Sequence, residues 1–121
     1  MNLKVIDCDF SVCKVKETGD INFNDRFVFV SVTDEEVSLV CSTDCVPKDC
    51  LEVEHGWKAF RVEGTLEFSM VGVLAKISAI LAEHNISIFV VSTFNTDYVL
   101  VKAERMYRAI QVLKENGYVF V

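Results

Sequence analysis

The stretch that decides the fold is FRVEGTLEFSMVGVLAKISAILAEHNISIFVVSTFNTDYVLVK, residues 60–102. Its middle carries apolar residues at helical intervals, which form one continuous stripe: Met70, Val73, Leu74, Ile77, Ile80 and Leu81. Ser69 precedes the stripe and is a candidate N-cap, whereas Asn85 follows it and tolerates the left-handed conformation that ends many helices. This pattern predicts a helix at about residues 70–84.

After this helix the apolar period changes from 3.6 to 2, which is typical of strands. The segment is rich in β-branched and aromatic residues, and the link 94–97 contains the Asn and Asp that favour tight turns. A second helical stripe ends at Gly117, a common C-terminal stop. The predicted elements are strands at about 58–63, 86–93, 98–103 and 118–121 and helices at about 70–84 and 104–116. Their order, β-α-β-β-α-β, is that of ferredoxin-like folds.

The first half of the chain, residues 1–52, is a reduced unit. Alternating apolar residues predict three strands, at about 3–16, 27–32 and 37–42, with no amphipathic helix between the first two. Pro47 lies in the segment that joins this half to the second unit, residues 57–121. Three strands with one covered face are marginal alone, so we expect the two units to share a core. The predicted fold class is α+β, with antiparallel sheets and helices on one face.

A binding site is predicted where the loop before the first helix meets the hairpin. The free N–H groups and positive dipole end of a helix suit a carboxylate, and Gly72 lets a ligand approach the backbone closely. On the hairpin, Asp97 suits an ammonium or guanidinium group, and Phe94 offers an apolar or cation–π wall. Together these groups suit a zwitterionic amino acid. From the pattern alone, the simpler interpretation has more weight: Ser69 as a cap, Gly72 as a packing residue and Asp97 as a turn former.

Three runs, FSMVGVL (68–74), HNISIFVVST (84–93) and STFNTDYVLV (92–101), resemble an ACT domain. The resemblance covers residues 57–121 well and residues 1–52 more weakly, through FSVCK and VSVTDEEVSLVCSTDCVP. The chain is similar to small proteins that carry two ACT-like units and, more distantly, to the regulatory domains of aspartate kinases and the animal cytosolic arginine sensors. This resemblance implies an amino-acid site formed by Ser69, Met70, Val71 and Gly72 on the loop and Phe94, Thr96 and Asp97 on the hairpin.

Composition excludes several classes of partner. The net charge of −6 and the sequence pI of about 4.8 argue against nucleic acid and anionic membrane. Five cysteines without a signal-peptide pattern indicate free thiols, and Cys41, Cys45, Cys50 and His55 lack the spacing of a zinc knuckle, so we expect no metal. No apolar run reaches the roughly 20 residues needed to cross a bilayer. We expect a cytoplasmic protein with no cofactor.

No nucleophile elbow, Walker loop or metalloprotease motif occurs, so we expect no enzyme. Both faces of the predicted hairpin are apolar and the helices can cover one, which predicts a homodimer or higher oligomer. The first hypothesis is a sensor that binds a free amino acid at loop 67–72 and hairpin 92–97 and then changes its assembly or partner contacts. The alternative is a protein-interaction module without a metabolite ligand. The sequence leaves open which amino acid binds and which partner is regulated.

Overall fold

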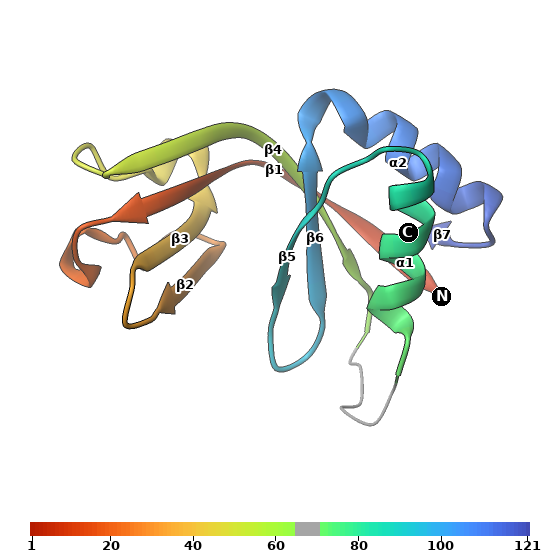
Figure 1. The fold of residues 1–121 in the computed structure, drawn as a ribbon, viewed down its shortest axis with the longest axis horizontal. Coiled ribbons are helices and arrows are strands. Elements are labelled where there is room, and N and C mark those ends of the chain that lie inside the picture. The colour runs from red at the N-terminus through yellow and green to blue at the C-terminus, as the bar shows by residue number, and fades with distance from the viewer. Residues whose placement is uncertain (65–70) are drawn as a thin grey trace. The chain divides into compact units, whose positions relative to one another are not determined.

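The computed structural model describes residues 1–64 and 71–121 (Figure 1). The chain divides into two compact units. We call residues Met1–Asp7 with Lys58–Val121 the helical unit and residues Cys8–Trp57 the strand unit. Two long strands, β1 (Asn2–Val15) and β4 (Glu52–Val62), contribute residues to both units.

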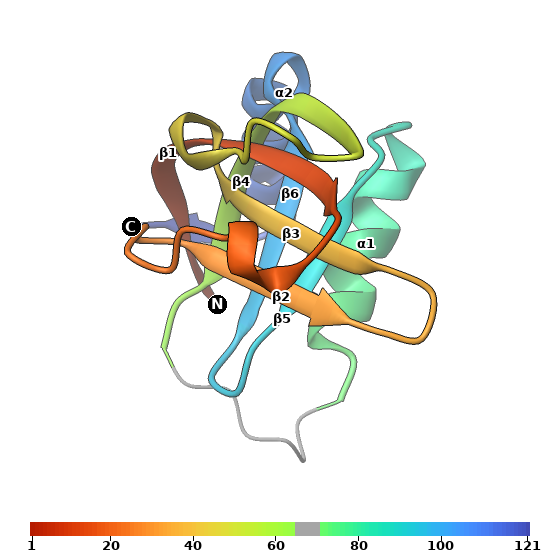
Figure 2. The ribbon, with the colours of Figure 1, turned by 90° about the vertical axis from the view of Figure 1, so that its left-hand side faces the viewer.

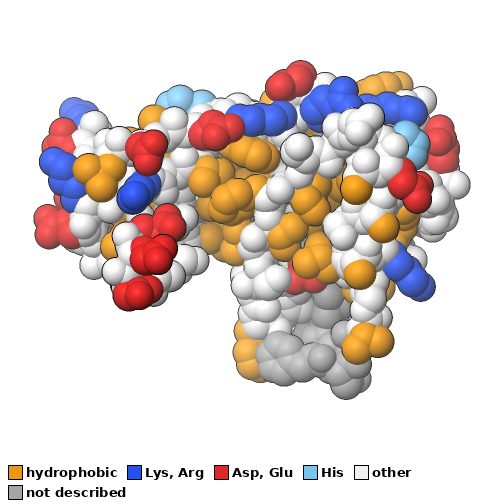
Figure 3. Space-filling model, viewed as in Figure 1, with side chains coloured by type: hydrophobic (Ala, Val, Ile, Leu, Met, Phe, Trp, Pro, Cys, Tyr) orange, Lys and Arg blue, Asp and Glu red, His pale blue; other side chains and the backbone are white. Residues whose placement is uncertain are grey.

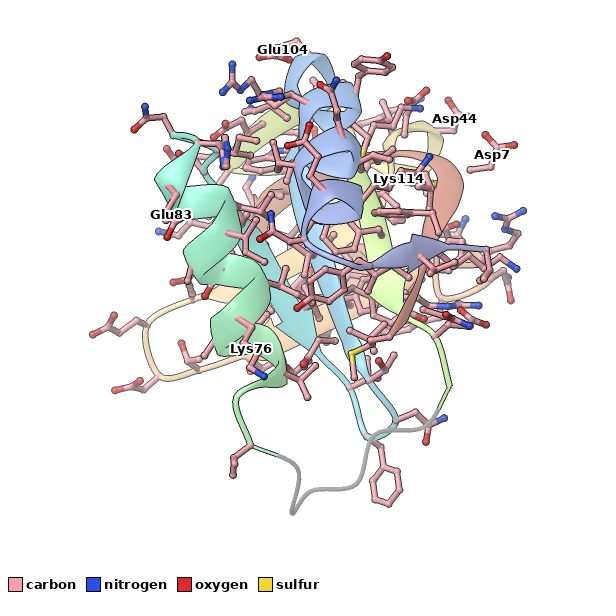
Figure 4. The ribbon with its side chains drawn as sticks, turned by 90° about the vertical axis from the view of Figure 1, so that its right-hand side faces the viewer. Asp7, Asp44, Lys76, Glu83, Glu104 and Lys114 are labelled. Atoms are coloured by element: carbon pink, nitrogen blue, oxygen red, sulfur yellow. The ribbon has the colours of Figure 1, made fainter. Side chains whose placement is uncertain are left out.

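The helical unit contains the α+β arrangement that the sequence predicts. After β4 come α1 (Val73–Glu83), β5 (Phe89–Ser92), β6 (Asp97–Lys102), α2 (Ala103–Glu115) and β7 (Val119–Phe120). Its strands follow the order β7-β1-β4-β6-β5. Both helices lie on the same face of this sheet (Figure 4). The buried side chains that join the helices to the sheet include Leu3, Phe60, Val62, Ile77, Leu81, Val99, Val101, Met106, Ala109, Val112 and Leu113. The prediction of an α+β fold with two helices is confirmed.

The pairing of β1 corrects one prediction. We expected antiparallel sheets throughout, yet β1 pairs parallel with β7, through Asn2 with Val119 and Leu3 with Phe120. On its other edge, the carbonyl of Asn2 accepts a hydrogen bond from the N–H of Glu63 at 2.9 Å. The first residues of the chain thus lie between β4 and β7 in the sheet order. Alternation along residues 3–16 indicates a strand but does not reveal its partner, which is why the sequence missed this insertion.

Helix α1 begins later than predicted. Its first residue is Val73 and its N-cap is Gly72, which has a φ of 80°. The prediction that Ser69 caps this helix is therefore wrong, and Ser69 and Met70 themselves lie outside the described residues. At the other end Asn85 adopts a φ of 57°, and the N–H of Ile86 donates to the carbonyl of Leu81 at 3.0 Å. This is the left-handed closure expected of Asn at a helix end.

The strand unit has the order β2-β3-β1-β4, with β2 (Val28–Val32) and β3 (Val37–Ser42) visible in Figure 2. Its helical segments are two single turns, η1 (Thr18–Asp20) and η2 (Thr43–Cys45). The buried side chains at its centre are Cys13, Val15, Ile21, Leu39 and Cys41. Strand β4 begins at Glu52, earlier than the sequence pattern indicates, because the backbone already pairs with β1: Leu51 N–H donates to the Lys14 carbonyl at 2.7 Å.

The same hairpin turn occurs once in each unit. In the β2–β3 turn, Thr33 N–H donates to the Glu36 carbonyl at 2.9 Å, and in the β5–β6 turn Thr93 N–H donates to the Thr96 carbonyl at 2.8 Å. In both turns the threonine hydroxyl also accepts the N–H of the fourth residue, at 3.2 and 3.3 Å. After the hairpin the chain forms the single turn η2 in one unit and the 13-residue helix α2 in the other. The strand unit thus repeats the hairpin of the helical unit without its long helix.

Candidate functional site

The β5–β6 hairpin carries three of the predicted ligand-binding residues. Ser92 and Asp97 face each other across the strands, and the Ser92 hydroxyl donates to the Asp97 carboxylate at 2.6 Å. Phe94 lies at the tip with 78% of its surface exposed. Thr96 is 8% exposed, and its hydroxyl donates to the Val62 carbonyl at 2.7 Å. This bond fixes the hairpin tip to the end of β4.

The start of α1 carries the other two described candidates, Val71 and Gly72. Both line a cavity of about 670 Å³ together with Met1, Lys76, Asn116 and Tyr118. Val71 is 91% exposed, and Lys76 lies near the N-terminal end of the helix (Figure 4). The first-turn N–H groups and the Lys76 ammonium both favour an anion at this end.

A second, polar cavity of about 280 Å³ lies between the end of β4 and the hairpin. We call it the Arg61 cavity; its lining residues include Arg61, Glu63, Thr93, Asn95, Thr96 and Tyr98. Arg61 Nε donates to a Glu63 carboxylate oxygen at 3.2 Å, and Arg61 Nη1 donates to the Tyr98 hydroxyl at 3.2 Å. The hydrogen bond to Tyr98, and after it the one to Glu63, raises the pKa of Arg61 against the opposing effect of burial.

The structure distributes the predicted residues over different places. Val71 and Gly72 line the first cavity and Thr96 lines the Arg61 cavity, and these two cavities share no described lining residue. The sequence analysis missed Arg61, Glu63 and Tyr98. Glu63 follows Arg61 by two residues, just past the end of β4, a spacing that puts both side chains on the same face of extended backbone and that the sequence contains. The contact of Arg61 with Tyr98 depends on the neighbouring positions of β4 and β6, which the sequence does not show.

In the strand unit, a serine lies beside a histidine. The Ser11 hydroxyl is 2.7 Å from His55 Nδ1 and 2.9 Å from the Thr43 hydroxyl. A serine nucleophile must be reachable by its substrate, and Ser11 is fully buried. This arrangement is therefore a structural link between β1 and the residues that follow β3.

The cysteines of the strand unit are free thiols, and Cys13 and Cys41 are buried. Burial, followed by the proximity of Cys13, raises the pKa of Cys41 to about 12. Across residues 1–64 and 71–121, no group of three or more His, Cys, Asp or Glu side chains is placed to hold a metal ion. In the same residues, no helix has the length and apolar character needed to cross a membrane.

Comparison with solved structures finds whole-chain similarity. The protein Atu0741 from Agobacterium tumefaciens is 28% identical, with a TM-score of 0.85 over 99% of this chain and 91% of that one. The regulatory subunit of aspartate kinase from Thermus thermophilus, in its ligand-free form, shares the fold at 10% identity, with a TM-score of 0.63 over 97% and 98% of the two chains.

An aspartate kinase from Clostridium acetobutylicum, described as an allosteric enzyme, shares the fold with a TM-score of 0.64 at 16% identity. The alignment covers 93% of this chain but only 33% of the kinase. No curated protein sequence matches the chain. The family model of the ACT domain matches residues 52–115, more than half of the 121 residues. The chain therefore belongs to the ACT domain family.

Proposed function

We propose that this ACT protein is a regulatory protein that binds a free amino acid and changes its assembly or its contacts with a partner. The match to the ACT domain over residues 52–115 is the observation that carries the proposal. The similarity in fold to an aspartate kinase regulatory subunit over nearly the full length of both chains supports it. We expect the protein to act in the cytoplasm, because free thiols are the form that a reducing compartment maintains.

The proposed ligand contacts are Ser69, Met70, Val71 and Gly72 before α1 and Phe94, Thr96 and Asp97 on the hairpin. The hairpin offers a carboxylate, and the start of α1 offers helix N–H groups. A ligand that bridges the two segments, within one chain or between two copies, would stabilise one assembly over another by its difference in affinity for the two states. The mechanism thus requires no catalytic group.

We further propose that the chain forms a homodimer. Strand β5 is the last strand in the sheet order, so the described chain provides a strand neighbour on one of its edges only. Hydrophobic side chains are visible at the surface near the centre of the space-filling view (Figure 3), and the β5 residues Phe89, Val90 and Val91 are half-buried. A second copy would cover this surface. Sedimentation as a monomer at micromolar concentration would contradict the proposal.

The alternative function is a module that binds another protein and no metabolite. The exposure of Val71 and Phe94, at 91% and 78%, is the observation that favours it, because exposed apolar residues are common in protein interfaces. It predicts that no amino acid stabilises the protein.

A thermal-shift screen with the twenty amino acids separates the two functions. A ligand at a hundred times its Kd stabilises the folded state by about 2.7 kcal/mol. For 121 residues the entropy of unfolding is about 0.25 kcal/mol/K, so the expected rise in Tm is roughly 10 °C. Wild-type protein that shows no rise with any amino acid would contradict the proposal.

The same screen on Asp97→Ala tests the acidic residue. We expect this variant to keep its fold and to lose the response to the amino acid, because Asp97 is one of the proposed ligand contacts and its carboxylate is gone. Asp34→Ala is the matched control, since Asp34 is an exposed acidic residue in the turn of the other hairpin. An Asp97→Ala variant with wild-type affinity would refute the role of Asp97.

A further inference from the structure

The Arg61 cavity places a positive and a negative side chain next to each other on one wall. Arg61 and Glu63 are 27% and 35% exposed and form an ion pair at 3.2 Å. The hydroxyl of Thr96 holds the hairpin against β4 at Val62, between the two charged residues, so the cavity has a fixed boundary. A site with balanced charges suits a ligand that carries both charges itself.

The Arg61 guanidinium is held in place before any ligand arrives. Glu63 accepts from Nε, Tyr98 accepts from Nη1, and the Tyr98 ring centroid is 5.8 Å from the guanidinium carbon. Arg61 Nη2 has no hydrogen-bond partner among the described residues. The N–H groups of this partly exposed guanidinium therefore remain available to a ligand carboxylate. Arginine in this state binds carboxylates well, because little side-chain freedom is lost when the ligand binds.

Glu63 offers a carboxylate oxygen to the positively charged group of a ligand. Arg61 occupies one oxygen of its carboxylate, and the second oxygen has no partner among the described residues. This oxygen suits an ammonium group a few ångströms from the guanidinium. Thr93 and Asn95 line the same cavity and offer a hydroxyl and an amide to a polar side chain.

We infer that the Arg61 cavity binds the α-carboxylate of an amino acid through Arg61 and its α-ammonium through Glu63. The volume of about 280 Å³ lies below the range of roughly 300–1,000 Å³ of drug-sized pockets, which indicates a small ligand. Val62 is the single aliphatic side chain among the lining residues that are described. The ligand is therefore an amino acid with a short polar side chain. This inference rests on the proposed function and assigns its ligand class.

Calorimetric titration of the full chain with L-serine, L-threonine, L-asparagine and L-aspartate tests the ligand class, with L-leucine as the apolar comparison. We expect at least one of the polar amino acids to bind more tightly than leucine. Binding of leucine alone would overturn the assigned class. If no amino acid binds to wild-type protein, the proposed function fails and this inference fails with it.

The residue roles are tested with the polar amino acid that binds best. We expect Arg61→Met to weaken binding by about 100-fold, Arg61→Lys by about 10-fold because the planar fork is lost, and Glu63→Gln by about 10-fold. Arg108→Met is the control, since Arg108 is exposed on α2, outside the residues that line the cavity, and pairs with Gln111. Wild-type affinity in both Arg61→Lys and Glu63→Gln would overturn the inference and leave the proposed function standing.

Two ligand analogues connect each residue to one end of the ligand. Ethanolamine lacks the carboxylate of serine, and N-acetyl-L-serine lacks its ammonium. We expect Arg61→Lys to weaken L-serine binding but not ethanolamine binding, and Glu63→Gln to weaken L-serine binding but not N-acetyl-L-serine binding. Circular dichroism establishes that each variant is folded. If Arg61→Met does not fold, the two conservative variants still decide the outcome, because equal effects on serine and its analogues would contradict the assignment.

Discussion

Replacing Thr96 with valine should test how firmly the hairpin is attached to β4. Valine has nearly the shape of threonine, so the substitution removes the hydroxyl and little else. The lost bond is the 2.7 Å contact to the Val62 carbonyl, made by a residue that is 8% exposed. Leaving a buried acceptor without its donor costs about 1–3 kcal/mol, and we take about 1.5 kcal/mol here. With an unfolding entropy of about 0.25 kcal/mol/K, Tm should fall by about 6 °C.

Urea and thermal unfolding, followed by circular dichroism, measure this change. The matched control is Thr93→Val, which removes an exposed hydroxyl that donates to the Thr96 carbonyl at 3.1 Å and accepts the Thr96 N–H at 3.3 Å, two contacts that water can replace. We expect the control to lose less than about 0.5 kcal/mol. A Thr96→Val variant within about 0.3 kcal/mol of the wild type would show that this bond does not hold the hairpin, and the fixed boundary of the Arg61 cavity would lose its basis.

Two further predictions concern the strand unit. Cys13 and Cys41 should resist alkylation by iodoacetamide at neutral pH until the protein unfolds, because burial raises the pKa of both thiols. Peptide mass spectrometry measures the labelling, and rapid labelling of either thiol in native protein would contradict the prediction. Burial raises the pKa of Asp25, but hydrogen bonds from the Ser42 side chain and backbone, with smaller ones from Phe27 and Arg26, outweigh it, so the folded-state pKa is lowered. A lowered pKa adds stability that is present above about pH 4 and is lost as the pH falls through the folded-state value. In Asp25→Asn, the free energy of unfolding, measured by urea unfolding at a series of pH values, should therefore fall less steeply below about pH 4 than in the wild type. If the free energy of unfolding of that variant falls with acid as steeply as in the wild type, the role of Asp25 is refuted.

Much of the helical unit could be predicted from the sequence. The apolar stripe of α1 predicts which residues are buried, and Ile77 and Leu81 are fully buried. The change of period after Asn85 predicts the β5–β6 hairpin, and the fold class follows from the order of elements. These features are local, because each depends on residues within a few turns of one another.

The parts that the sequence did not reveal depend on contacts between distant residues. Arg61 and Tyr98 are 37 residues apart and meet because β4 and β6 are neighbours in the sheet. The N-cap of α1 was misplaced because the apolar stripe includes Met70 and therefore points to Ser69, a common cap residue, whereas the helix begins only after Gly72. The place of β1 beside β7 depends on strand register, which alternation alone does not determine.

The insertion of the first residues between β4 and β7 has a consequence for engineering. The ACT family match begins at residue 52, yet the side chain of Leu3 is fully buried in the core of the helical unit. A fragment cut at the limits of that match would lose both β1 and β7 and leave the edge of β4 open to self-association. The ACT unit of this chain therefore cannot be moved into another protein without the first residues of the chain. A fusion partner at the N-terminus of the chain would be attached directly to a strand of the sheet.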